Sequence, residues 1–239
     1  MLIDAKGLNY KSLNELIKSS DNDCRIENCL GQRFIADGLG NGKVTINGIP
    51  GNALGAYLNG AEITVMGNAQ DAVGDTMNDG KIIIHGGVGD TAGYAMRGGE
   101  IYVKNNAGYR AGIHMKEYRD KKPVIVIGGR TGSFLGEYQA GGLIIVLGRN
   151  TDGKPTVGNF PCTGMHGGKM MIRGSVSGIK FPSQVTLNAA DENDMNEIMP
   201  YLKSYCEYFD IDINELIKEK FTVITPDSEK PYKQMYVAN

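Results

Sequence analysis

The sequence predicts an all-β solenoid: a single-stranded, right-handed parallel β-helix of about seven coils, with short N- and C-terminal helices as caps. Three observations support this prediction. Glycines recur on one template, short apolar runs follow the template at a nearly constant distance, and the period is close to 20 residues. Such a period is typical of solenoids, in which each coil can bury its apolar face only against its neighbours. The right hand follows from the strong preference of parallel crossovers.

The glycine template is G-x-x-G-x-x-x-G, and its last position is taken here as offset zero of a coil. The seven zeros are separated by steps of 19, 19, 19, 19, 24 and 26 residues and fall at Ala36, Gly55, Gly74, Gly93, Gly112, Gly136 and Cys162. Glycine tolerates positive φ and close backbone approach, so the repeat glycines are expected to form corners. The glycines with this structural role are Gly48, Gly51, Gly55, Gly74, Gly86, Gly89, Gly93, Gly108, Gly112, Gly129, Gly132 and Gly136.

The apolar runs that follow the zeros have the pattern of β-strands. They begin with Val44–Ile46 and Ile63–Val65, and their first and third residues are always aliphatic or Met. This period of two predicts one inward face, while the middle residue varies. A second apolar column lies at offset +3 and comprises Leu39, Leu58, Met77, Met96, Met115, Gln139 and Met165. We interpret this column as core rather than as a Met-rich binding face; Gln139 would then need a hydrogen-bond partner.

The chain divides into three predicted parts: an N-terminal cap over 1–30, the repeat over 31–187, and a C-terminal cap and tail over 188–239. A short amphipathic helix is expected at 9–19 with Asn9 as N-cap. Two further helices are expected at 191–208 and 212–220, and Pro200 should break or kink the first of them. Another apolar run covers 221–225, and the tail from Pro226 to Asn239 is expected to be extended and to wrap the rod or a partner.

Two insertions interrupt the period, one at 116–122 and one at 148–154. Insertions in repeat proteins project as loops and often lie on a binding face. Solvated loops without a ligand are an equally good interpretation of both.

Composition limits the classes of function. The 239 residues carry a net charge of −2, which gives no indication of nucleic-acid binding. No apolar stretch is long enough to cross a membrane and the start does not resemble a signal peptide, so a cytoplasmic protein is expected. The cysteines fit no common metal-binding spacing and are expected to be free thiols: Cys24, Cys29, Cys162 and Cys206.

The sequence predicts no catalytic, cofactor-binding or metal site. The phosphate-binding motif G-x-x-x-x-G-K-[ST] is absent, and Gly87–Ala92 is better explained as a corner than as a dinucleotide loop. The histidines, His85, His114 and His166, occupy different columns, which argues against a shared metal. Acidic turn residues could bind a cation but are more often solvated: Asp71, Asp75, Asp79 and Asp90.

The in-register repeat resembles the C-terminal β-helix domain of the glutamate synthase large subunit over about 31–176. The segments Gly86–Gly93 and Thr163–Gly168 are similar to that family. The resemblance implies a stand-alone, non-catalytic structural subunit of a split glutamate synthase, an oxidoreductase complex that makes glutamate from glutamine and 2-oxoglutarate. Its partners would be a glutaminase subunit and an FMN-binding synthase subunit, and FMN and iron–sulfur clusters would reside in the partners. The chain has no Cys at position 2 to serve as an N-terminal nucleophile, no room for an FMN barrel and no cluster-ligand spacing. It therefore resembles the stand-alone version of the domain, which would carry no cofactor itself.

Other functions remain open at this point. The same fold serves as the β-helix component of formylmethanofuran dehydrogenase, and as a subunit of methylamine–glutamate N-methyltransferase. An independent β-helix acyltransferase is a third alternative, although its six-residue periodicity is missing here. Assembly of several copies of this chain into a homo-oligomer is compatible with all of them.

Overall fold

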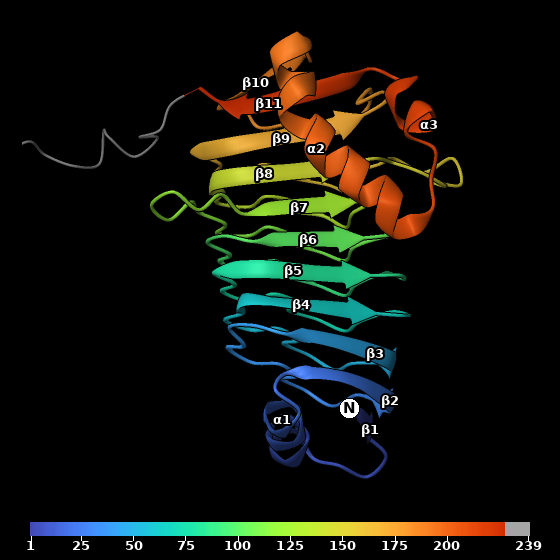
Figure 1. Ribbon diagram of the computed structural model, residues 1–239. Coiled ribbons are helices and arrows are strands. Elements are labelled where there is room, and N and C mark those ends of the chain that lie inside the picture. Colours follow the sequence, from blue (N-terminus) through green and yellow to red (C-terminus); the bar gives the residue numbers. More distant parts are fainter. Residues whose placement is uncertain (228–239) are drawn as a thin grey trace, which may run out of the picture.

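The computed structural model describes residues 1–227 and shows a β-solenoid of about eight turns (Figure 1). All strands belong to one sheet in the order β1-β2-β3-β4-β5-β6-β7-β8-β9-β11-β10. In Figure 1 the strands of the stack run from left to right across the front while the chain climbs, which makes the coil right-handed. The predicted fold class is therefore confirmed. The strands of the stack are β1 (Leu2–Asp4), β2 (Asp23–Leu30), β3 (Lys43–Ile49), β4 (Asn59–Val65), β5 (Asp79–Ile84), β6 (Glu100–Val103), β7 (Val124–Ile127), β8 (Ala140–Val146) and β9 (Gly167–Arg173).

The strands pair in parallel, so equal positions of successive coils lie side by side. The first position of each apolar run forms one continuous column through Val44, Ile63, Ile82, Ile101, Ile125, Ile144 and Met170. The ladder also includes β2, where Cys24 pairs with Val44 and Ile26 pairs with Ile46. The stack thus begins before residue 31, because β2 has the strand pattern without a glycine template ahead of it.

The column at offset +3 is buried in the core, as predicted. Its polar member, Gln139, is fully buried and donates from Nε2 to the carbonyl oxygens of Gly141 (3.2 Å) and Gly142 (3.1 Å). Among residues 1–227 the Oε1 atom of Gln139 has no hydrogen-bond partner. At this position of the column Gln139 stands where other coils have Met or Leu. Its amide nitrogen is hydrogen-bonded, whereas its amide oxygen is not bonded within the described chain.

The zero positions are corners with left-handed backbone. Gly93 has φ +70°, and a Cβ placed there would overlap Cδ1 of Ile125 in the coil stacked above. The two zeros that are not glycine keep the same conformation, with φ +58° at Ala36 and +59° at Cys162. Small residues at zero therefore satisfy two demands, positive φ and a tight fit against the next isoleucine.

Helix α1 (Tyr10–Ser19) covers the N-terminal end of the stack, as predicted. The Asn9 side chain accepts hydrogen bonds from the backbone N–H groups of Lys11 (3.0 Å) and Ser12 (3.1 Å). Leu13 and Ile17 on one face of the helix are buried in the main core.

The C-terminal part comprises β10 (Val185–Ala189), α2 (Glu192–Phe209), α3 (Ile213–Ile217) and β11 (Phe221–Pro226). Asp191 caps α2 as expected, and its Oδ1 accepts from the N–H of Asp194 at 2.8 Å. The helix continues through Pro200, so the predicted break is absent. Strand β11 inserts between β9 and β10 and runs antiparallel to both. The expectation of a wrapping tail falls on residues 228–239, outside the described part.

Candidate docking surfaces

The outer face of the sheet is covered by α2 over only part of its length. In Figure 1 the helix runs from the β10–β11 end of the sheet down to about the level of β6. With residues of β5 to β9 and β11 it forms a second hydrophobic cluster separate from the main core. On the helix side this cluster includes Ile198, Leu202, Tyr205 and Phe209.

The middle residues of the strand runs explain this coverage. Those under α2 are apolar or aromatic and buried: Ile83, Tyr102, Val126, Ile145 and Met171. In β3 and β4, which α2 does not reach, the equivalent residues are the partly exposed Thr45 and Thr64. The middle residue of each strand run is therefore apolar or aromatic where α2 packs on the coil, and Thr in β3 and β4, where the sheet is uncovered.

A buried phenol attaches α2 to the stack. The Tyr205 hydroxyl donates a 2.9 Å hydrogen bond to the backbone carbonyl of Lys104. Burial raises the pKa of Tyr205 to about 12, so the hydroxyl remains a donor at neutral pH. Tyr102 beneath the helix donates to Glu100 Oε2 at 2.6 Å, and burial raises its pKa strongly as well.

Charged side chains hold the N-terminal half of α2. Lys169 Nζ contacts Asp194 and Glu197, each at 2.7 Å, and Lys122 of the first insertion also pairs with Glu197. Burial disfavours the charged forms here, but the mutual hydrogen bonds prevail. They raise the pKa of Lys169 and lower the pKa values of Asp194 and Glu197. The insertion at 116–122 is therefore tied to the cap helix through its last residue.

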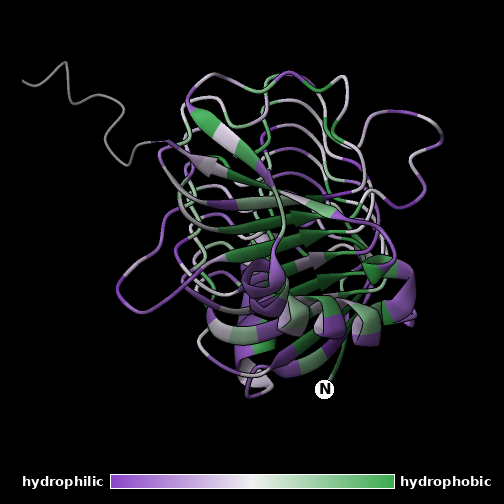
Figure 2. Ribbon diagram, turned by 90° about the horizontal axis from the view of Figure 1, so that it is seen from above, coloured by the Kyte–Doolittle hydropathy of each residue, from purple (hydrophilic) through white to green (hydrophobic). Residues whose placement is uncertain are grey.

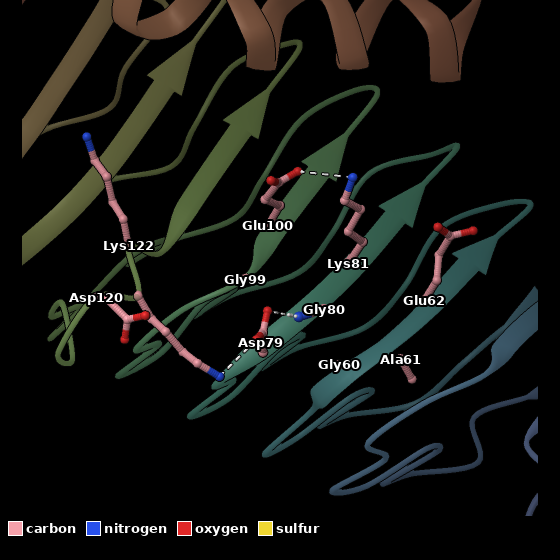
Figure 3. A pocket seen from close by; sticks show the side chains of 11 residues that line it. Gly60, Ala61, Glu62, Asp79, Gly80, Lys81, Gly99, Glu100, Asp120 and Lys122 are labelled. Atoms are coloured by element: carbon pink, nitrogen blue, oxygen red, sulfur yellow. Dashed lines mark hydrogen bonds and ion pairs between the residues drawn. The ribbon is translucent and has the colours of Figure 1, made fainter.

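A polar hollow of about 500 Å³ lies between the first insertion and β4–β6 (Figure 3). Lys121 Nζ is 2.8 Å from Asp79 Oδ2, and Lys81 Nζ is 3.7 Å from Glu100 Oε2. The hydrogen bond from Lys121 lowers the pKa of Asp79. The two lysines are thus neutralised by neighbouring carboxylates, an arrangement suited to holding the insertion against the sheet.

The turn carboxylates serve the stack in a way that sequence reasoning missed. Asp71 Oδ1 accepts from the N–H of Asp90 at 2.9 Å, and Asp90 Oδ1 accepts from the N–H of Tyr109 at 2.8 Å. These residues share offset −3, so each side chain caps the backbone of the coil above. The signal was present in the sequence as Asn, Asp and Ser at this offset: Asn52, Asp71, Asp90, Ser133 and Asn159.

The three histidines lie apart, as their columns predicted. The rings of His85 and Phe209 meet edge to face with their centroids 5.2 Å apart. Burial, together with nearby Lys104, lowers the pKa of His85. His114 stacks on Tyr138 with centroids 5.2 Å apart, and His166 Nδ1 is 2.9 Å from the Gly164 carbonyl. Within residues 1–227 no three His, Cys, Asp or Glu side chains are grouped so that they could hold a metal ion. The cysteines are all buried and unpaired by disulfides.

Residues 21–230 match the family described as the GXGXG motif. This chain is a member of the GXGXG family. Its domain is of the glutamate synthase C-terminal type and occupies most of the chain.

Two further comparisons extend this finding. An uncharacterized protein of Methanocaldococcus jannaschii is 44% identical over 250 residues, which cover 99% of this chain and 96% of that protein. Among solved structures, a chain of the formyltransferase/hydrolase complex of Methylorubrum extorquens with methylofuran matches with a TM-score of 0.59 at 18% identity. The match covers 91% of this chain and 88% of that one. At this identity the likeness shows the fold alone.

The GXGXG solenoid has one wall rich in exposed aromatic rings. We define the corner wall by the outward offsets −3, −2, +1 and +2 of the seven coils. Six exposed aromatic residues lie on it, with between 37% and 59% of their surface exposed: Phe34, Tyr57, Tyr94, Tyr109, Tyr138 and Phe160. The two other exposed aromatics of the described residues border this wall, Tyr10 against Phe34 and Tyr118 beside Tyr57.

The insertions of this GXGXG protein project from opposite sides of the stack as hydrophilic loops (Figure 2). The first, at 116–122, leaves the edge where the strands begin, and the second, at 148–154, leaves the other edge (Figure 1). No helix of the described part is both long and apolar enough to cross a bilayer.

Proposed function

We propose that this chain is a non-catalytic assembly subunit of a multi-subunit enzyme complex. The observation that carries the proposal is the use of its reactive side chains for the fold. Asp71 and Asp90 cap neighbouring coils, and Asp79, Lys121 and Lys169 hold the insertion and α2. A rigid rod with such a surface is suited to positioning other subunits rather than to performing a reaction.

Two kinds of complex fit this role. The first resembles the formyltransferase/hydrolase complex, in which a chain with the same fold matches nearly end to end. This protein would then take the place that the β-helix component has in formylmethanofuran dehydrogenase. The second is a split glutamate synthase, supported by the type of its glycine-repeat domain. There the partners would be a glutaminase and an FMN-binding synthase subunit with iron–sulfur clusters. Since fold alone does not determine function, the two complexes can be distinguished only by identifying the partner subunits.

The test is purification of the native complex from cells that carry a tag on this chain. Stoichiometric partners are identified by mass spectrometry, and the pooled complex is assayed for glutamate formation and for formyl transfer. Recovery of formyl-transferring or hydrolytic subunits supports the first complex, whereas a flavin-containing synthase and a glutaminase support the second. A chain that always purifies without other subunits, or that catalyses either reaction alone, overturns the proposal.

A further inference from the structure

The corner wall carries a charge pattern that complements itself. In the central coils its outer edge at offset −3 bears the exposed carboxylates of Asp71 and Asp90, which we call the acidic ridge. Beyond the opposite edge, at offset +4, Arg97 and Lys116 are exposed and form the basic ridge, which Arg119 of the first insertion extends. Within the described chain none of these five side chains forms an ion pair with another residue.

The rings between the ridges are arranged to meet a protein surface. His114 and Tyr138 are stacked with their planes 8° apart, and Phe134 stacks on Phe160 at 5.3 Å. Arg110 covers Phe134 at 4.7 Å and pairs with Glu137 at 3.0 Å. Neighbouring coils thus occupy a face of each ring in these two stacked pairs, whereas sugar rings bind to flat, exposed aromatic faces. Exposed aromatics gathered on one side are typical of protein interfaces.

We propose that the corner wall is an isologous interface to a second copy of this chain. A twofold axis parallel to the solenoid axis exchanges the two edges of the wall while keeping the coils level. Asp90 then lies opposite Arg97 of the other copy, with Lys116 of that copy one coil above and Asp71 one coil below, and the rings pack between the two ridges. A twofold interface requires such self-complementarity, because every contact occurs twice.

The dimensions of the wall suit this arrangement. Seven coils about 4.8 Å apart make it about 34 Å long. Seven residue steps from offset −3 to +4 span at most about 23 Å. The face from offset −3 to +4 therefore measures at most about 780 Å². The turns within it reduce its width, so it lies below the roughly 800 Å² per partner of standard stable interfaces, and the first insertion adds to it. The first insertion projects from the basic edge (Figure 1) and extends the contact onto the acidic ridge of the second copy.

The test measures the mass of the full-length chain by light scattering and sedimentation at micromolar concentrations. The expected particle has twice the 25.8 kDa chain mass. The variant Arg97→Glu/Lys116→Glu should weaken the dimer at least tenfold, while Lys203→Glu/Lys218→Glu, on exposed residues of the C-terminal cap, should not. Tyr109→Ser/Phe160→Ser should weaken it similarly, with Ile217→Ser on α3 as its control.

A charge swap distinguishes specific contacts from general damage. Adding Asp71→Lys/Asp90→Lys to the Arg97→Glu/Lys116→Glu variant should restore dimers, because the exchanged ridges again face each other. Thermal unfolding verifies the fold of this variant, since Asp71 and Asp90 also cap backbone groups. A monomeric wild-type chain, a dimer indifferent to all wall variants, or a wall shielded only by a different subunit each overturns the proposal. None of these results argues against assembly of an enzyme complex, and a wall shielded by a different subunit would support it.

Discussion

Tyr205 in α2 and Lys104 after β6 are 101 residues apart in sequence, yet the Tyr205 hydroxyl donates a 2.9 Å hydrogen bond to the Lys104 carbonyl. The bond joins the C-terminal cap to the middle of the rod, where the phenol is buried against Gly128. Because a Cβ at residue 128 would overlap that hydroxyl, the glycine makes room for the attachment.

The substitution Tyr205→Phe tests this attachment. Losing the hydroxyl should lower the free energy of unfolding by about 1 kcal/mol, because the carbonyl of Lys104 loses a buried donor. Urea unfolding followed by circular dichroism measures the difference. Tyr10→Phe on α1, outside the corner wall, is the matched control: its side chain is exposed, and a change above about 0.5 kcal/mol there would show that the assay reports something other than the buried bond.

Replacing Gly93 with Val should destabilise the rod by several kcal/mol, since the site combines φ +70° with an overlap on Ile125. Chemical denaturation gives the value. Gly40→Ala serves as control, because no atom lies within 4 Å of its added Cβ and its φ is not positive. Equal stabilities of the two variants would contradict the assignment of zero positions as tight corners.

Because α2 covers only part of the sheet, equivalent strand positions should respond differently to substitution: polar residues should be costly under the helix, and apolar residues should be harmless outside it. Ile145→Thr should cost about 2 kcal/mol, because it places a hydroxyl and a void beneath the helix. Thr64→Ile on the uncovered part of the sheet should change stability by no more than about 0.5 kcal/mol. Denaturant midpoints of both variants provide the comparison, and a costly Thr64 change would mean that β4 is covered as well.

The Lys169 cluster predicts a pH dependence with two limits. The lowered pKa values of Asp194 and Glu197 contribute stability above their unfolded values, about 3.9 and 4.3, and this is lost as pH falls below them. The raised pKa of Lys169 contributes stability below its unfolded value of about 10.4, and this is lost as pH rises through the folded pKa.

The variant Lys169→Met should therefore be less stable than the wild type by about 1 kcal/mol between pH 5 and 9. The difference should shrink below about pH 4 and above about pH 10.5. Unfolding free energies measured across this range test the cluster, with Lys203→Met on the exposed side of α2 as control. A difference that stays constant down to pH 3 would exclude the carboxylates as the source.

The strongly periodic part of the molecule could be predicted from sequence, and the parts that depend on distant contacts could not. Residues Val44 and Ile63 predicted a parallel ladder because each coil repeats the same offsets. Pro200 does not break α2, because the packing of Leu202 and Tyr205 outweighs the local preference for a break, and the predicted kink is the alternative that remains. The antiparallel β11 has the composition of any buried strand, and its direction follows from the path of α2 and α3.

The surface was predicted least well. The carboxylates of Asp71 and Asp90 were interpreted as solvated turns, yet their positions at offset −3 make them caps of the next coil. The gathering of rings such as Tyr109 and Phe160 on one wall becomes visible only when offsets are compared across coils. Outward columns vary more in residue type than inward ones, because solvent accepts many side chains that a packed core does not.

The two strands that end the sheet, β11 and β10, also limit how long the rod can become. A stack of parallel coils is an open template, onto which another copy could add its first strand and continue as a fibre. Beyond β9 the next strand runs the opposite way, and β10, only five residues long, forms the final edge. The edge strand β10 again runs in the direction of β1–β9, but no repeat corner precedes it for an incoming coil to stack on, and short edge strands discourage such growth. The chain therefore carries its own polymerisation stop, and its length stays that of one molecule.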